Sequence, residues 1–438
     1  MTRRIPLLFR QAAYSLRGGF LVRPLTIALA LGAAGAIFSS LEETFPADAA
    51  RGLSVLFPSQ TDPQVAQIIL SSIATSIMTV VSIVFAILLM TLTLASMQFS
   101  PRILVSFVRD RVTQWTLGIF LGTFSYCMAA LPAARSAPKP FAPVFTMLGA
   151  MVLALACVAW LLFFIHHISH AISVNHIIDR IASETLAVVD QLMPHPRRGE
   201  RLPHPDQAEP ETWEARVTSD TSGYIRFIDV KRLIEVAKEH RVKVGVMRRV
   251  GQFVPAGVPL LRASKWDLLT PEAIAAFRSA FDYGPARTLQ QDVEFGVLQI
   301  VDIALKAISP AVNDPSTAIG CIDQLSRIII AVISRDPPES LLYDPPGVLR
   351  VSIPWTSFEG LLDSAFEQIR MYSKSDVAVS LRLLRALGDI ASTTQDSHLH
   401  QVLATRGQRV VDGCVSQLSE DELRPLRDRH NEILRSSL

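Results

Sequence analysis

The stretch PQVAQIILSSIATSIMTVVSIVFAILLMTLTLASMQFSP, residues 63–101, decides the fold of this chain. It contains no charged residue, and Arg102, Arg109 and Arg111 follow it closely. A helix rises about 1.5 Å per residue, so this run is longer than the roughly 30 Å hydrocarbon layer of a bilayer. The sequence therefore predicts a helix that crosses a membrane and whose C-terminal end projects beyond the lipid.

Small polar residues recur along this run at helical spacing and share one face. This polar stripe consists of Ser72, Thr75, Ser76, Thr79, Ser82 and Thr93, with Ile83, Ala86 and Met90 filling a gap on the same face. Ser and Thr allow membrane helices to approach closely and hydrogen-bond, so the stripe is typical of helix packing. A pore lining with an apolar constriction explains the same pattern, and all nine residues are candidate pore-lining residues.

Composition indicates an integral membrane protein with an additional soluble part. Of the 438 residues, 49% are hydrophobic and 19% are charged, and the mean hydropathy is +0.31. A net charge of +2 gives no reason to expect a nucleic-acid partner. The four cysteines form no CxxC pair, so we expect neither a disulfide framework nor a four-cysteine metal site.

Three further uncharged runs, 24–41, 112–134 and 140–165, are long enough to span a bilayer. Five arginines precede the first span and three follow the second, against one and two basic residues in the other loops. Since cytoplasmic loops carry the excess of Lys and Arg, we expect four spans with both termini cytoplasmic, in a bacterial inner (plasma) membrane. The sequence Ala47-Asp48-Ala49 is similar to a signal-peptidase site, so cleavage of the first span is an open alternative.

The remaining chain divides into further segments. Residues 1–23 form a basic N-terminus, 24–165 the membrane domain, 166–193 an amphipathic exit helix and 194–212 a Pro-rich linker. Strand-like alternation predicts a small β-module over 213–265, followed by a helical domain over 266–438. Within the module, Gly251 and Gly257 of the turn sequence GQFVPAGVPL suit a hairpin that needs positive φ. The predicted helices of that domain are 271–282, 292–308, 315–334, 357–372, 376–392, 397–417 and 421–436. We expect 213–438 to fold by itself as a soluble fragment.

Two resemblances accompany this pattern. GYI at 223–225 with GQFVPAGVPL at 251–260 resembles the half-repeats of barrel-sandwich modules, which in lipoyl and biotinyl carriers present a modifiable lysine at a hairpin tip. Lys231 and Lys243 lack the carriers' flanking motif, so we expect a structural module without cofactor. ASMQFSPRIL at 95–104 and QDVEFGVLQIVDIALKAISPAVNDPSTA at 291–318 resemble a bacterial family of predicted membrane proteins with a domain of unknown function, number 2254. That resemblance implies membrane spans followed by a soluble domain, but no activity.

Two polar clusters are candidate sites. Asp302 and Lys306 share the polar face of the predicted helix 292–308, and Asn313 with Asp314 begins the next helix, whose N-terminus suits an anion. These four residues form either a candidate ligand pocket or an ordinary solvated face. His166, His167 and His170 form either a solvated interfacial cluster, a metal site or a pH sensor.

The predicted function follows from what the chain has and lacks. No nucleotide-binding or hydrolase motif is present, and the four runs contain no ionisable residue of the kind that coupled transporters place at mid-depth. Four short spans leave little interior, so we expect a homo-oligomer around a shared axis. The sequence predicts a non-enzymatic, channel-like pore for an ion or small solute with a cytoplasmic regulatory domain. A non-conducting scaffold or sensor that recruits a partner is the alternative.

Overall fold

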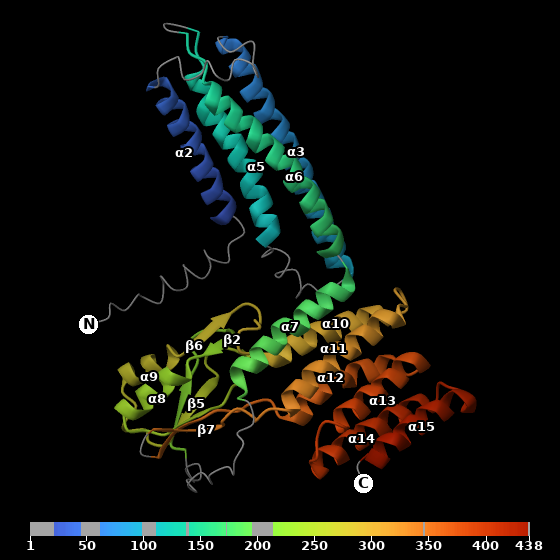
Figure 1. Cartoon of the computed structure of the whole chain (residues 1–438). Helices are drawn as coiled ribbons and strands as arrows, with labels where there is room; N and C mark the ends of the chain where they lie inside the picture. Colours follow the sequence, from blue (N-terminus) through green and yellow to red (C-terminus); the bar gives the residue numbers. More distant parts are fainter. Residues whose placement is uncertain are drawn as a thin grey trace. The chain divides into compact units, whose positions relative to one another are not determined.

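The structure is a computed structural model that describes residues 22–44, 62–98, 111–136, 140–171, 173–194, 213–344 and 347–436. Its contacts divide the chain into two compact units, Met1–Ser173 and Val174–Leu438 (Figure 1). The basic N-terminus up to residue 21, Ala47-Asp48-Ala49, Arg102, Arg109 and the linker from residue 195 lie outside the described residues.

The described residues of the first unit form four apolar helices. They are α2 (Val22–Thr44), α3 (Pro63–Gln98), α5 (Arg111–Ala130), which continues into the short 3-10 helix η3 (Leu131–Ala133), and α6 (Val144–Ala171). α5 packs against the other three. A Cβ atom at Gly118 or Gly122 of α5 would lie 2.6 or 2.5 Å from a methyl carbon of α2, so the small residues permit close contact.

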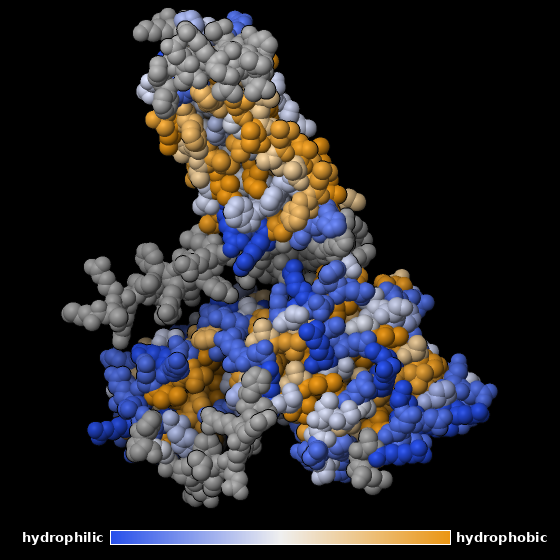
Figure 2. Space-filling model, in the orientation of Figure 1, coloured by the Kyte–Doolittle hydropathy of each residue, from blue (hydrophilic) through white to orange (hydrophobic). Residues whose placement is uncertain are grey.

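Five described helices are long and apolar enough to cross a membrane: these four and α11 (Pro315–Ile333) of the second unit. α11 packs against other helices of its own unit, and Ile322, Leu325 and Ile329 are fully buried there. Figure 2 shows that apolar side chains cover most of the visible surface of the first unit, whereas hydrophilic residues dominate the visible surface of the second. The two units therefore present different surfaces to their surroundings.

In the described part of the second unit, seven helices pack outside the two sheets: α7, α10, α11, α12, α13, α14 and α15. Their bounds are α7 (Val174–Leu192), α10 (Val293–Ala307), α12 (Phe358–Tyr372), α13 (Val377–Ala391), α14 (Ser397–Cys414) and α15 (Glu420–Ser436), besides α11 as given above. Side chains of Asp292, Asp314, Ser357, Asp376 and Asp396 cap five of these helices by accepting backbone N–H groups. The predicted helices of this region match the observed ones within a few residues.

The predicted exit helix 166–193 is two helices, because α6 ends at Ala171 and α7 begins at Val174. α7 belongs to the second unit and packs against α10 and α11. Thr185 of α7 lies directly on Gly296 of α10, where an added Cβ would be only 1.9 Å from the threonine Oγ1. The predicted linker 194–212 thus follows a helix that already forms part of the second unit's core.

Strands from three parts of the chain build two sheets in the second unit. The strands are β1 (Ala215–Thr218), β2 (Gly223–Ile228), β3 (Val244–Val246), β4 (Phe253–Val254), β5 (Pro259–Ala263), β6 (Phe281–Gly284), β7 (Leu341–Asp344) and β8 (Val348–Ser352). One sheet has the order β1-β5-β3-β8-β7 and the other β4-β2-β6. All pairings are antiparallel except that of β3 with β8. Both sheets share one hydrophobic core with α8 (Val230–Glu239) and α9 (Pro271–Arg278).

This sheet arrangement corrects two expectations. β6, β7 and β8 lie beyond residue 265, so the region expected to be purely helical contributes three strands. Gly251 and Gly257 do adopt the positive φ predicted for them, at +86° and +85°. However, the strands beside them do not pair as a hairpin, because β4 joins one sheet and β5 the other.

Candidate functional site

The polar stripe lies on the outer face of α3. All nine of its residues are exposed in the single chain, including Ile83 and Met90 at 54% and 65%. The buried residues of α3, such as Leu70, Ala74 and Val84, pack into clusters with α5 and α6. At 100° per residue these buried positions fall on the side of the helix opposite the stripe. The stripe therefore packs against no other described helix of its own unit.

Four hydroxyl groups of the stripe, those of Thr75, Thr79, Ser82 and Thr93, donate to carbonyl oxygens within α3. Thr79 Oγ1 donates to the Thr75 carbonyl at 3.1 Å, and Ser82 Oγ donates to the Met78 carbonyl at 3.0 Å. Thr75 and Thr93 form the same bond to the carbonyl four residues earlier. A hydroxyl that donates to its own helix still has an oxygen that can accept, so the stripe can meet either another helix or water.

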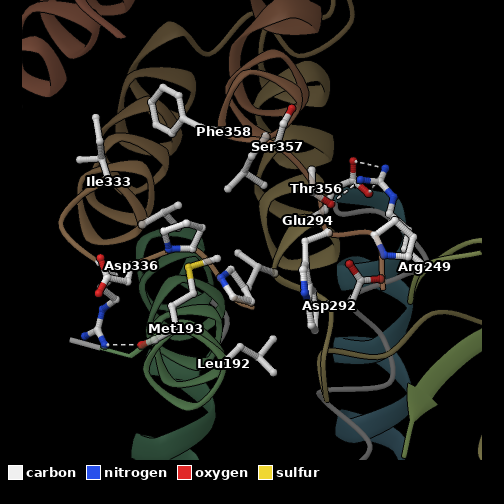
Figure 3. A pocket seen from close by; sticks show the side chains of 18 of the residues that line it. Leu192, Met193, Arg249, Asp292, Glu294, Ile333, Asp336, Thr356, Ser357 and Phe358 are labelled. Carbon is white, nitrogen blue, oxygen red and sulfur yellow. Dashed lines mark hydrogen bonds and ion pairs between the residues drawn. The ribbon is translucent and has the colours of Figure 1, made fainter. Parts of the chain in front are cut away.

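The second unit contains a cavity of about 400 Å³ (Figure 3). The C-terminal ends of α7 and α11 and the N-terminal ends of α10, α12 and α14 surround it. An apolar wall includes Leu192, Met193, Ile333, Trp355, Phe358 and Leu399. Figure 3 shows Leu192, Met193 and Ile333 on one side, with Arg249 and Glu294 across from them. The cavity thus combines an apolar wall with a polar end.

Four charged residues form a network at the polar end. Arg287 binds both Asp292 oxygens, at 2.8 and 2.9 Å, and reaches Glu294 at 2.9 Å. Arg249 contacts the same Glu294 carboxylate at 3.3 and 3.4 Å and donates to Thr356 Oγ1. The Asp292 side chain is 4% exposed and the Arg287 side chain 16%. Bidentate geometry of this kind fixes the orientation of both partners.

Burial is the largest single influence on the pKa values of Asp292 and Arg287. It raises the pKa of Asp292, and the neighbouring Arg287 offsets only part of that effect. Burial acts to lower the pKa of Arg287, but the hydrogen bond and charge of Asp292, followed by those of Glu294, outweigh it and raise that pKa. The guanidinium therefore stays charged between its two acids.

Gly251 allows this network to form. Its φ of +86° is a conformation that suits glycine, and an added Cβ would lie 2.2 Å from Asp292 Oδ2. The backbone before β4 can therefore cover the ion pair only because no side chain is present at this position.

Comparison with known proteins shows the family to which the chain belongs. The family model described as "Predicted membrane protein (DUF2254)" matches residues 17–389. The chain belongs to this family. It is 32% identical over 377 residues to the uncharacterized protein Rv1290c of Mycobacterium tuberculosis, covering 84% of this chain and 71% of the relative. The uncharacterized protein Mb1321c of Mycobacterium bovis matches with the same figures. No solved structure matches the chain.

The four residues predicted as a ligand pocket lie at the other end of the α10–α11 hairpin and do not line the cavity. Lys306 follows Asp292 by 14 helical positions, or roughly 21 Å at 1.5 Å per residue. Asp302 and Lys306 are partly buried on α10, and Asn313 is exposed with φ +51°. Asp314 caps α11 by accepting from the Thr317 backbone N–H at 3.1 Å and from its hydroxyl at 2.6 Å. Its carboxylate is thus already used within its own helix.

The cavity residues that sequence reasoning missed include Arg249, Glu294 and Trp355. A usable signal was present, because Asp292 and Glu294 open the QDVEFG stretch that resembles the family. Asp292 shares the predicted polar face with Asp302, but it lies at the start of the helix, where three helix N-termini converge. Only the long-range contacts of α12 and α14 reveal that convergence.

The histidine cluster lies near the C-terminal end of α6. His166 is exposed, and the ring of His167 stacks on Phe163 with ring centres 6.4 Å apart. The side chain of His170 is outside the described set. Among the described residues, no three His, Cys, Asp or Glu side chains are grouped as metal ligands.

Proposed function

We propose that this membrane protein is an oligomeric channel in which the α3 helices of several copies line a pore for an ion or small solute. The proposal includes four spans, α2, α3, α5 and α6, with the second unit as a cytoplasmic regulatory domain. The observation that carries it is the outward exposure of the whole polar stripe. Burial of α11 within the second unit supports counting four spans rather than five.

Oligomerisation gives the stripe a role that a single copy does not. The Ser and Thr residues of the stripe pack against no described helix of their own unit. In a monomer they would therefore face lipid. Copies arranged around a common axis can turn this face inward, where hydroxyl oxygens meet water. Ile83, Ala86 and Met90 would then form the narrow, apolar section that gates by excluding water.

Flux through purified protein in liposomes tests the pore. We expect Met90→Ser to raise leak, because polarity is introduced into the apolar section, and Thr79→Val to reduce flux or leave it unchanged. Phe85→Ser is the matched control, since Phe85 is also exposed but lies about 140° around the helix from Met90, outside the stripe. If wild type and Met90→Ser both show no flux across voltage, pH and osmotic stress while the protein is still assembled, the channel proposal is wrong.

A non-conducting scaffold or sensor is the second candidate, because an outward stripe of small residues also suits packing between copies. In that case Thr79→Val would weaken assembly by on the order of 1 kcal/mol, the cost of a lost interhelical hydrogen bond. Met90→Ser would cause no flux. The second unit would then recruit a protein partner.

The topology belongs to the same proposal: both termini are cytoplasmic in a bacterial inner membrane. The excess of arginine before α2 and between α3 and α5 supports it. The close approach of α2 to α5, where a Cβ at Gly35 would lie 2.5 Å from the Tyr126 carbonyl oxygen, supports retention of the first span. A cytoplasm-active reporter fused after Leu438 should work, and activity of a periplasmic reporter there would reverse the topology.

We further propose that the two-sheet region is a structural module of barrel-sandwich type. Lys231 lies in the first turn of α8, and Lys243 immediately precedes β3, where its backbone N–H donates to Ser264 Oγ at 3.0 Å. Neither position is the tip of a two-strand hairpin. Intact-mass measurement of the native protein checks this, since an added lipoyl or biotinyl mass would contradict it.

A further inference from the structure

We propose that the cavity of the second unit binds an amphipathic organic cation, with an ammonium or similar head and an aromatic or branched apolar body. Its volume of about 400 Å³ lies within the range of ligand pockets, roughly 300–1,000 Å³. Ligand pockets typically combine apolar walls with a few convergent polar groups, as this one does. The inference does not depend on whether the protein conducts.

The apolar wall selects the body of the ligand. Met193 and Ile333 come from the ends of two different helices, and Trp355 and Phe358 add aromatic surface. The Trp355 indole N–H donates to the Glu339 carbonyl at 3.1 Å, so its orientation is fixed. Aromatic surface beside a polar end favours organic cations, because the face of the ring attracts positive charge.

The charges of the lining select the sign of the head group. Four carboxylates, of Asp292, Glu294, Asp336 and Asp396, and only two guanidiniums, of Arg249 and Arg335, line the cavity. Two neighbours outside the lining also contribute charge: Arg287 binds Asp292 and Glu294, and Asp190 contacts Arg335. With these two included, five carboxylates stand against three guanidiniums, and this excess of acid in a partly enclosed space favours a cation over an anion.

Glu294 is the residue that we expect to meet the head group. Arg287 holds one of its oxygens at 2.9 Å, whereas Arg249 approaches the carboxylate only at 3.3 and 3.4 Å. The second oxygen otherwise accepts from Ser364 at 3.1 Å. A ligand ammonium can therefore replace the longer contact with Arg249, while Arg287 keeps the carboxylate in place.

A charge series of small probes tests the assignment. Equilibrium binding to the full-length protein in nanodiscs, with empty nanodiscs as the blank, would compare 3-phenylpropylammonium, 3-phenylpropanol and 3-phenylpropionate. These share one apolar body, so their differences report the head group. We expect the ammonium to bind at least tenfold more tightly than the other two. Tighter binding of the propionate, or equal binding of all three, would overturn the proposal.

Two variants and a control locate the site. Leu399→Trp should fill the cavity and abolish binding, and Glu294→Gln should weaken binding of the ammonium at least tenfold. Glu235→Gln on α8, whose side chain is 68% exposed and away from the cavity, should leave it unchanged. Thermal unfolding of each variant shows whether it is folded, and Leu399→Trp leaves the charged network intact. Undiminished binding to folded Leu399→Trp would place the ligand elsewhere and refute the site, whatever the flux assay shows.

Discussion

The two units of this chain place their large apolar side chains in opposite ways, exposed in the first and buried in the second. In the first, large side chains such as Leu155 and Leu162 of α6 are exposed at 71% and 66%. In the second, Val244, Leu325 and Leu384 are fully buried or nearly so. Since the protein belongs to a membrane family, lipid can cover the first surface, whereas the second unit must bury its own core. Apolar content alone therefore says little about where a core lies.

The units also differ in what holds their helices together. In the first, glycines allow close backbone contact between α2 and α5, and Glu42 of α2 accepts from the N-terminal N–H groups of α6. In the second, acidic and hydroxyl side chains cap their own helices, and amphipathic faces pack together. This comparison predicts a large loss of stability where an apolar helix face is uncovered and a small loss where a single surface charge is removed.

The largest expected effect is the loss of α7. Because α7 belongs to the second unit, we replace the sequence-based expectation for 213–438: we now expect 174–438 to be soluble and to unfold cooperatively, and 213–438 to aggregate or melt without cooperativity. Without α7 the partners of Ile177, Ile181 and Val188 on α10 and α11 become exposed. Each such side chain contributes about 1.5–3 kcal/mol, and several together approach a typical net stability of about 5–15 kcal/mol. Equal cooperative melting of both fragments in calorimetry would refute this boundary and restore the one predicted at 194–212.

Gly296→Ala should destabilise the second unit by about 1–3 kcal/mol, as overpacking does. The added Cβ would overlap Thr185 Oγ1, at 1.9 Å, and the α7–α10 contact would have to open. Gly320→Ala on α11 is the control, because its Cβ would meet only Asn175 Oδ1 at 3.8 Å. Chemical denaturation should show the loss for the first variant alone, with partial recovery in Gly296→Ala with Thr185→Ala. Equal stability of both alanine variants would contradict the close α7–α10 contact.

In the first unit, Glu42→Gln should lower the stability of the full-length protein in detergent by about 1.5–3 kcal/mol, typical of hydrogen bonds to a charged group. The carboxylate accepts from the backbone N–H of Phe145 and Thr146 at 2.7 and 2.9 Å and from the Thr146 hydroxyl at 2.8 Å. Glu43→Gln is the matched control. Its ion pair with Arg135 is partly exposed, so about 0–1 kcal/mol is expected. Equal melting temperatures of the two variants would show that Glu42 does not hold α6.

Local pattern in the sequence predicted most of the helices but not their partners. The N-terminal cap Asp314 and the helical period of α11 are local signals. The predicted helix 315–334 therefore differs from the observed one by a single residue at its C-terminal end. β8 was missed because its pairing with β3 joins segments about a hundred residues apart, as Val244 with Val351 shows. The break between α6 and α7 was missed because one amphipathic pattern runs from the last residues of α6, beginning at 166, into α7, while only α7 packs against α10 and α11.

The candidate sites show the same division. Helical spacing was enough to place Thr79 and Met90 on one face of α3, but whether that face points outward depends on where α5 and α6 pack. The cavity depends even more on distant contacts, since Glu294 and Trp355 both line it although α11, β7 and β8 lie between them in the chain. A polar helix face therefore predicts neither which end carries a cavity nor which residues complete it.

The smallest expected effect is a pH-dependent one at Asp314. Hydrogen bonds from the hydroxyl and the backbone N–H of Thr317 lower the pKa of this carboxyl below its ordinary value of 3.8. A lowered pKa means that the folded state favours the carboxylate, so its stabilising contribution is present above pH 3.8 and disappears as the pH falls through the lowered value. Asn is also a good helix cap, so Asp314→Asn removes mainly the charge and its interaction with the α11 N-terminus.

Melting temperatures of wild type and Asp314→Asn should therefore differ slightly at pH 7, with wild type higher, and converge below about pH 3.8. The pKa values of other carboxyls, such as Glu367, are also lowered. Those groups are common to both proteins, so only the difference between the two melting curves reports Asp314. A difference that keeps its size from pH 7 to pH 3 would mean that the cap acts through shape alone and that the charge adds nothing.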